Sequence, residues 1–210
     1  MELVAATRNR KKLEEMRRIL EGAGVRLMGL DDFPSCPEVE ETGATFEENA
    51  VAKARAVMAF TGKAAVADDS GLEVDALGGA PGVFSARYAG EGASDRENFE
   101  KLLREMAGVP EGRRTARFVC VIALALPGGP VETFRGAVEG TIGRGPEGRT
   151  GFGYDPVFYP LGHRRTFAQM EPAEKDSMSH RGRALEGLRR RLAGLAEGAG
   201  RGDNREKSGP

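Results

Sequence analysis

The stretch TARFVCVIALAL, residues 115–126, decides how this chain folds. Its apolar residues run almost without interruption from Phe118 to Leu126, which is typical of a strand buried in the centre of a sheet. The run is far too short to span a membrane as a helix. After the turn sequence PGGP, residues 127–130, we expect residues 131–142 to return as the hairpin partner of this strand.

Outward from this hairpin, short apolar runs predict further strands, and apolar residues at helical spacing predict helices. Two capping boxes mark helix starts, Thr45 with Glu48 and Ser94 with Glu97. The expected strands span residues 2–6, 63–67 and 156–159; the expected helices begin at residue 11 and span about 45–60, 94–106 and 183–195. Because strands and helices mix without strict alternation, the sequence predicts an α/β fold with a mixed β-sheet flanked by helices.

Length and composition narrow the class of protein. The 210 residues indicate one domain, which we expect to span residues 1–197, followed by a disordered, glycine-rich and charged tail over 198–210. A net charge of −1 argues against binding of nucleic acid through bulk positive charge. Cys36 and Cys120 lack the spacing of a zinc ribbon or a disulfide-rich module. No signal-peptide pattern opens the chain, so we expect a cytoplasmic protein with no membrane partner.

Two stretches are candidates for binding phosphate and metal. Residues 7–12, TRNRKK, join an expected strand to an expected helix, and the free amides of a helix start favour anions. Residues 68–71, DDSG, follow another expected strand, and carboxylates together with phosphate oxygens suit Mg²⁺. If extended, Asp68 and Asp69 point in opposite directions, so that one serves the site and the other the scaffold. A second carboxylate could come from the acidic cluster at residues 38–41, but each of these stretches alone also fits an ordinary surface segment.

Two later stretches are candidates for recognising a base. In GFGYDP, residues 151–156, glycines flank Phe152, whose ring could stack on a purine. In KDSMSHR, residues 175–181, a lysine, a histidine and an arginine could donate hydrogen bonds to keto oxygens. The alternatives are a tight turn with aromatic residues in the core and a basic helix start on the surface. Lys53, on the second expected helix, would by default be solvated.

In this order, the stretches together resemble the inosine/xanthosine triphosphate pyrophosphatase family. The matching segments are ATRNRKKLEEM, EETGATFEENAVAKA, VADDSGLEVDALGGAPGVFSARYAG, GFGYDPVF and AEKDSMSHRGRAL. The resemblance implies an elongated fold of two lobes with a central cleft, usually assembled as a homodimer. It also implies a Mg²⁺-dependent enzyme that cleaves ITP, dITP and XTP to a monophosphate and pyrophosphate, which cleanses the nucleotide pool of non-standard purines.

The same resemblance implies roles for individual residues. Asp69 would bind Mg²⁺ and accept a proton from water, with Glu40 as the second metal ligand, although the sequence does not separate Glu40 from Glu41. The triphosphate would contact Thr7, Arg8, Asn9, Arg10, Lys11, Lys12 and Lys53. The nucleoside would contact Ser70, Phe152, Gly153, Tyr154, Asp155, Lys175, His180 and Arg181.

One position departs from the family pattern. The family commonly carries glycine between the threonine or serine and the asparagine of its first motif, where this chain has Arg8, and this puts the tightness of the turn in question. Two other interpretations stay open at this point. One is a nucleotide pyrophosphatase of different base preference, and the other is a nucleotide-binding regulator without turnover.

Overall fold

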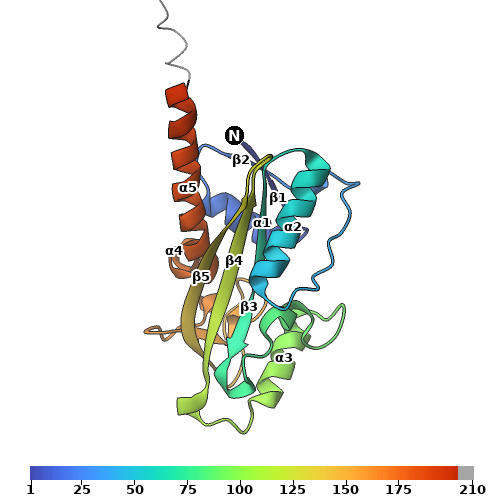
Figure 1. The fold of residues 1–210 in the computed structure, drawn as a ribbon. Coiled ribbons are helices and arrows are strands. Elements are labelled where there is room, and N and C mark those ends of the chain that lie inside the picture. The colour runs from blue at the N-terminus through green and yellow to red at the C-terminus, as the bar shows by residue number, and fades with distance from the viewer. Residues whose placement is uncertain (203–210) are drawn as a thin grey trace, which may run out of the picture.

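A six-stranded mixed sheet forms the centre of the computed structural model, which describes the backbone of residues 1–202 and the side chains of residues 1–197 (Figure 1). The strand order is β2-β1-β3-β4-β5-β6. β1 pairs in parallel with β2 and β3, and the other pairs are antiparallel, which confirms the predicted mixed sheet. The strands are β1 (Glu2–Ala5), β2 (Arg26–Met28), β3 (Ala65–Val74), β4 (Thr115–Ala125), β5 (Val131–Ile142) and β6 (Phe158–Pro160).

Several helices begin where the local sequence supplies a capping side chain. Both predicted capping boxes are present, with Thr45 accepting from the Glu48 amide and Ser94 from the Glu97 amide. The amide of Lys12 donates to the Asn9 side chain, which caps α1. The helices are α1 (Arg10–Ile19), α2 (Phe46–Thr61), α3 (Asp95–Glu105), α4 (Pro172–Met178) and α5 (His180–Gly202).

The predicted end of the third strand at the DDSG stretch is wrong. β3 runs through these residues to Val74 and stays paired with β4 over its whole length, with Asp68 opposite Ile122 and Asp69 opposite Val121. Two adjacent carboxylates in a buried strand are costly unless each has a partner. Partners from three helices, described below, remove that cost, and the sequence around the strand does not reveal them.

Smaller differences lie toward the C-terminus. β6 begins at Phe158 because residues 155–157 form a 3₁₀ turn, and neither β2 nor α4 was predicted. α5 begins at His180, three residues earlier than expected, and its backbone continues to Gly202, so it includes residues 198–202 of the expected tail. The remainder of that tail, residues 203–210, lies outside the described residues.

Strand alternation divides the upper core into two layers on opposite faces of the sheet. Odd-numbered residues of β3 and β4, such as Ala67 and Val121, pack in one cluster with α2. Even-numbered residues, such as Val66 and Ile122, pack in a second cluster with α1 and α5. Figure 1 shows α2 and α5 on opposite sides of the sheet. A third cluster, built around Phe118 and Phe158, fills the other end of the molecule.

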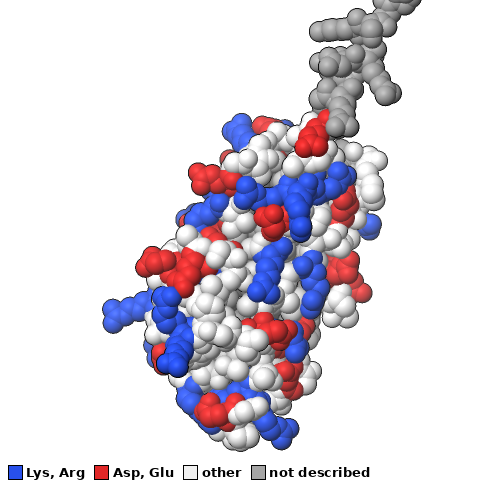
Figure 2. Space-filling view, turned by 90° about the vertical axis from the view of Figure 1, so that its left-hand side faces the viewer, with Lys and Arg blue, Asp and Glu red and all other residues white. Residues whose placement is uncertain are grey.

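The surface carries mixed charge. On the side that holds α5, basic and acidic side chains are interspersed, without a broad field of one sign (Figure 2). This pattern agrees with the balanced composition of the chain. Within residues 1–202, none of the helices is both long and apolar enough to cross a membrane.

Close contact between α5 and β5 yields a test of the fold with two glycines. A Cβ at Gly136 would lie 2.1 Å from the His180 carbonyl oxygen and 2.6 Å from the Ala184 amide nitrogen, whereas a Cβ at Gly194 of α5 would meet open space. Gly136→Ala should therefore lower the free energy of unfolding by at least about 2 kcal/mol. Gly194→Ala, the matched control, should raise it by about 0.5–1 kcal/mol through helix propensity. Urea denaturation measures both; equal effects would contradict the packing.

Candidate active site

The site begins where β1 stops and β3 continues. Ala5, the last residue of β1, is opposite Val66, so the chain that follows β1 passes beside Asp68–Ser70. The Asn9 amide donates to the Thr7 hydroxyl over 3.1 Å, and this short turn opens into α1. No residue other than glycine has a positive φ in the described chain, so Arg8 stands in the turn without backbone strain. The departure from the family's glycine therefore does not distort this turn.

The first of two adjoining cavities lies over this edge and has a volume of about 240 Å³. It contains most of the residues predicted to contact phosphate or metal, namely Thr7, Arg8, Asn9, Lys12, Lys53 and Asp69, together with Ser70, which was predicted to contact the nucleoside. Its far wall comes from Pro37, Glu38, Val39 and Glu41, in the loop before α2. We call it the phosphate cavity, for the cations and turn amides that line it.

Asp69 forms the acidic centre of this cavity. As an odd-numbered residue of β3 it faces α2, where Lys53 donates to it over 2.9 Å and Asn49 over 3.3 Å. Burial raises the pKa of Asp69, and the positive charge of Lys53 only partly offsets this effect. Burial opposes the charge on Lys53, but Asp69 and Glu41 outweigh it and raise the pKa of the lysine. A carboxylate more basic than usual is suited to accept a proton from water.

Glu41, and not Glu40, is the carboxylate that faces Asp69. Glu41 lines the phosphate cavity and accepts from Lys53 over 2.5 Å, whereas Glu40 is exposed and does not line the cavity. The structure thus places Glu41, and not Glu40, beside Asp69, while the role of second metal ligand stays a prediction. Glu41 and Asp69 converge on Lys53, and two carboxylates suit Mg²⁺, which takes its other ligands from phosphate and water. Within residues 1–197, no cluster of three or more His, Cys, Asp or Glu could hold a metal.

Asp68 serves the scaffold on the opposite face of the sheet. Arg181 from α5 donates its Nε to Asp68 over 2.8 Å, and Lys12 from α1 lies 2.5 Å from the same carboxylate. Ser70 and Cys120 also donate to it, over 2.9 and 3.0 Å. Burial alone would raise the pKa of Asp68, but Arg181 and Lys12 outweigh it and hold the pKa well below its usual range. The two aspartates therefore have different partners on opposite faces of the sheet, while the catalytic role of Asp69 stays a prediction.

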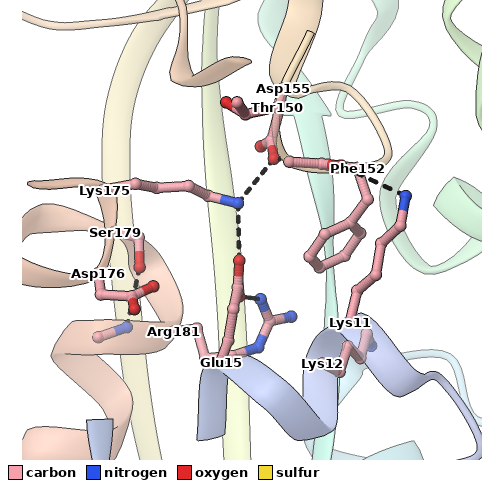
Figure 3. A network of polar contacts seen from close by, with 12 residues as sticks. Lys11, Lys12, Glu15, Thr150, Phe152, Asp155, Lys175, Asp176, Ser179 and Arg181 are labelled. Atoms are coloured by element: carbon pink, nitrogen blue, oxygen red, sulfur yellow. Dashed lines mark hydrogen bonds and ion pairs between the residues drawn. The ribbon is translucent and has the colours of Figure 1, made fainter. Parts of the chain in front are cut away.

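Glu15 of α1 joins this scaffold to the second cavity. Arg181 donates to one of its oxygens, and Lys175 donates to the other over 2.8 Å (Figure 3). Lys175 also donates to Asp155 over 2.6 Å, and Asp155 accepts from the Phe152 amide. Burial would raise the pKa of Glu15, but the two cations outweigh it and lower the pKa. These ion pairs link six charged side chains, which we call the buried network; they are Lys12, Glu15, Asp68, Asp155, Lys175 and Arg181.

The second cavity, of about 100 Å³, adjoins the first and shares Asn9, Lys12, Ser70 and Ala86 with it. We call it the base cavity. It contains all the residues predicted to contact the nucleoside, namely Ser70, Phe152, Gly153, Tyr154, Asp155, Lys175, His180 and Arg181.

Aromatic and cationic groups alternate in the base cavity. The Phe152 ring centre lies 4.8 Å from Lys175 Nζ and 5.5 Å from Arg181 Cζ, both within cation–π range. The His180 ring stacks on Phe118 with a centroid distance of 4.7 Å. Burial, reinforced by Arg181 and Lys175, lowers the pKa of His180 well below its usual range, so this imidazole is neutral. Its buried Nδ1 has no hydrogen-bond partner among the described residues.

Two residues predicted to contact the triphosphate lie elsewhere. Arg10 is exposed and lines neither cavity, and Lys11 donates to the Gly151 carbonyl over 3.3 Å on the outer side of Phe152. The reason is helical geometry: successive residues of α1 point about 100° apart, so Asn9 and Lys12 share one side and the two residues between them do not. The sequence of residues 7–12 alone does not show which of the six side chains face the cavity.

Sequence reasoning missed Glu15 and Asn49 as site residues. Both are buried polar side chains on helices whose other buried residues, apart from Lys53, are apolar. An acid three positions after Lys12, next to the core residue Met16, is the one local signal that could have pointed to Glu15. For Asn49 the sequence holds no such signal, since its partner Asp69 is twenty residues away.

Fold and site together define a class: an α/β protein in which a buried acidic centre and a cation-lined cavity for an anionic ligand adjoin an aromatic cavity. Comparison with known proteins places the chain more narrowly. The model of the Ham1 family matches residues 3–191, and the chain belongs to this family. This finding confirms the resemblance seen in the sequence motifs.

Similar proteins share most of their length with this chain. A dITP/XTP pyrophosphatase from Nocardia farcinica is 56% identical over 198 residues, which cover 93% of this chain and 96% of that protein. The solved structure of a HAM1 protein from Coxiella burnetii is 46% identical with a TM-score of 0.84, covering 92% of this chain and 98% of the other. The Ham1 protein of Staphylococcus aureus is 42% identical with a TM-score of 0.83, covering 93% and 100%.

Removal of one member of the buried network tests its contribution to stability. Asp68→Ala leaves Lys12 and Arg181 without their shared partner, and an uncompensated buried charge costs about 3–5 kcal/mol. Urea denaturation should show a loss of that size. Glu111→Ala removes an exposed ion pair with Arg144 and should change the stability little. A loss below about 1 kcal/mol for Asp68→Ala would show that the network is not what holds these elements together.

Proposed function

We propose that this protein hydrolyses non-standard purine nucleoside triphosphates, ITP, dITP and XTP, to the monophosphate and pyrophosphate in a Mg²⁺-dependent reaction. The observation that carries the proposal is the junction of the two cavities: the cavity that contains the acidic centre shares four lining residues with an aromatic, donor-rich pocket. The names of the close relatives, dITP/XTP pyrophosphatase, support it. Cleansing of the nucleotide pool would be its role in the cell.

The triphosphate would lie along the phosphate cavity. Lys12 and Arg8 line this cavity and would face the negative charge of the triphosphate. The turn at Thr7–Asn9 offers backbone and side-chain hydrogen bonds. Phosphoryl transfer depends mainly on such positioning and charge compensation. Two of the cations expected to do this, Arg10 and Lys11, line neither cavity, and the Lys11 amine donates to the Gly151 carbonyl.

Asp69 would accept the proton of the attacking water. Asn49 and Lys53 hold its carboxylate in place, so the group that takes the proton is oriented before substrate binds. Asp69 and Glu41 would hold Mg²⁺, which when bound would offset phosphate charge and lower the pKa of a coordinated water. The bond between the α- and β-phosphates then breaks, and pyrophosphate leaves.

The base cavity would select purines with an oxygen at position 6. Lys175 and Arg181 are charged donors, and the buried network fixes their direction. Hypoxanthine and xanthine present an acceptor to such donors, whereas adenine presents an amino group that would leave them unpaired. An unpaired buried donor costs about 1–3 kcal/mol, enough to separate the two kinds of base. Phe152 would stack on the ring.

We further propose that residues 1–197 act as one unit of two lobes, with the two cavities in the cleft between them. A cytoplasmic homodimer is part of the same proposal. The family resemblance supports the homodimer. The two free, buried cysteines suit a reducing compartment such as the cytoplasm.

Pyrophosphate release from ITP, XTP, dITP, ATP and GTP, each with Mg²⁺ and with EDTA, tests the proposed function. We expect rapid, metal-dependent release from the first three and much slower release from ATP and GTP. Adenine is rejected at position 6, whereas guanine shares the oxygen at position 6, so GTP has to be rejected at its 2-amino group. The control is Asp69→Asn, which cannot accept the proton and should lose at least about 100-fold in turnover. Equal rates on all five nucleotides would contradict the base selection, and no release from any would contradict the enzyme itself.

The pH dependence of turnover tests the role of Asp69. Only the ionised carboxylate accepts a proton, so the rate should fall as the pH drops through its pKa, which burial places above that of an ordinary aspartate. Lys53→Met removes a charge that lowers this pKa, and the acidic limb of kcat should therefore move to higher pH. Lys63→Met, which removes a surface pair with Glu2, should leave the limb in place. A limb that stays or moves to lower pH in Lys53→Met would contradict the assignment.

A further inference from the structure

Arg8 differs from the other cations that line the phosphate cavity. Lys12 is paired with Asp68 over 2.5 Å, and Lys53 is shared by two carboxylates, Glu41 and Asp69. Arg8 forms no ion pair with any side chain of residues 1–197, although it lines the same cavity. Its positive charge is therefore free of acidic partners within this part of the chain, and it is available to an anionic ligand.

The one hydrogen bond that the Arg8 side chain makes within residues 1–197 ties it to the opposite wall of the phosphate cavity. Its Nη2 donates to the carbonyl oxygen of Cys36 over 2.8 Å. Cys36 begins the wall segment, which we define as residues 36–45, drawn in blue before α2 in Figure 1. The Cys36 side chain is buried in the core, but none of the side chains at residues 37–45 is buried. Polar contacts, and not apolar packing, therefore hold most of the wall segment.

Few polar contacts join the middle of the wall segment to the body of the protein. Arg87 donates to the Glu41 carbonyl over 3.2 Å, and Lys53 binds the Glu41 carboxylate over 2.5 Å. Farther along, the Gly43 amide donates to Asn49 over 2.8 Å. Arg8 holds the beginning of the segment, so these four side chains together decide where Glu41 lies relative to Asp69.

We propose that Arg8 is a positioning residue that couples phosphate binding to the placement of Glu41, an inference that rests on the function proposed above. A guanidinium has five donors in one plane, so Arg8 can keep its bond to Cys36 while it presents other donors to a phosphate oxygen. A phosphate bound there restrains the guanidinium and, through it, the wall segment. Glycine at this position, the residue common in the family, can make neither contact.

Hydrogen exchange of the amides at residues 37–43 tests the coupling without any turnover. The probe is inorganic tripolyphosphate in metal-free buffer containing EDTA. In the wild-type protein the probe should slow exchange of these amides at least about fivefold. In Arg8→Ala the amides should exchange faster than in wild type, and the probe should protect them at most about twofold. Arg8→Lys, which can still donate to Cys36, should restore the exchange rate of the probe-free protein.

Kinetics provide the second readout and a matched control. Arg8→Ala should raise both the KM for ITP and the Mg²⁺ concentration at half-maximal rate by about fivefold, a change worth about 1 kcal/mol. Arg17→Ala removes an exposed arginine of α1 that lines neither cavity, and it should change neither quantity.

Two results would overturn the proposal: equal protection of residues 37–43 by tripolyphosphate in wild type and Arg8→Ala, or an unchanged Mg²⁺ requirement in Arg8→Ala. The exchange result is independent of the proposed reaction. If no nucleotide yields pyrophosphate but the exchange differences appear, the proposed function fails and the tether by Arg8 stands.

Discussion

The buried guanidinium of Arg181 is the group on which the rest of the structure depends. Its residue is 1% exposed, and it bridges Asp68 in the central sheet to Glu15 on α1. A charge so deep is tolerated only when every partner is present. The buried network meets this requirement because its three positive and three negative side chains form ion pairs with one another. The network thus fixes α1, α4 and α5 on one face of β3, and it leaves donors directed at the base cavity.

Strand alternation gives the two neighbouring aspartates different environments. Asp68 faces the network, whose cations lower its pKa. Asp69 faces α2, where burial raises its pKa and the charge of Lys53 only partly offsets this effect. One dipeptide therefore provides both a structural anchor and a basic carboxylate, because side chains of a strand point to opposite faces. Beyond the end of β1, both residues line the phosphate cavity although both are buried, so the anchor and the acidic centre adjoin the same space.

Much of the fold follows from local sequence. The hairpin of β4 and β5, both capping boxes and the mixed sheet were predicted correctly, because apolar runs and caps act over short distances. The end of β3 was not, since β3 stays paired with β4, which lies far along the chain. The position of Arg10 outside both cavities follows from helix geometry, and the pairing of Glu41 with Lys53 of α2 is not visible in the local sequence. Glu15 illustrates the limit well: its two partners lie 160 and 166 residues away.

The selectivity of Glu15→Gln for ITP over ATP, expressed as the ratio of kcat/KM values, tests the central claim most directly. Glutamine keeps the size of the side chain but weakens its hold on Lys175 and Arg181, the two charged donors of the base cavity. If the buried network aims these donors, the ratio should fall at least about tenfold, mostly through the value for ITP. A folded Glu15→Gln protein with the wild-type ratio would contradict the account.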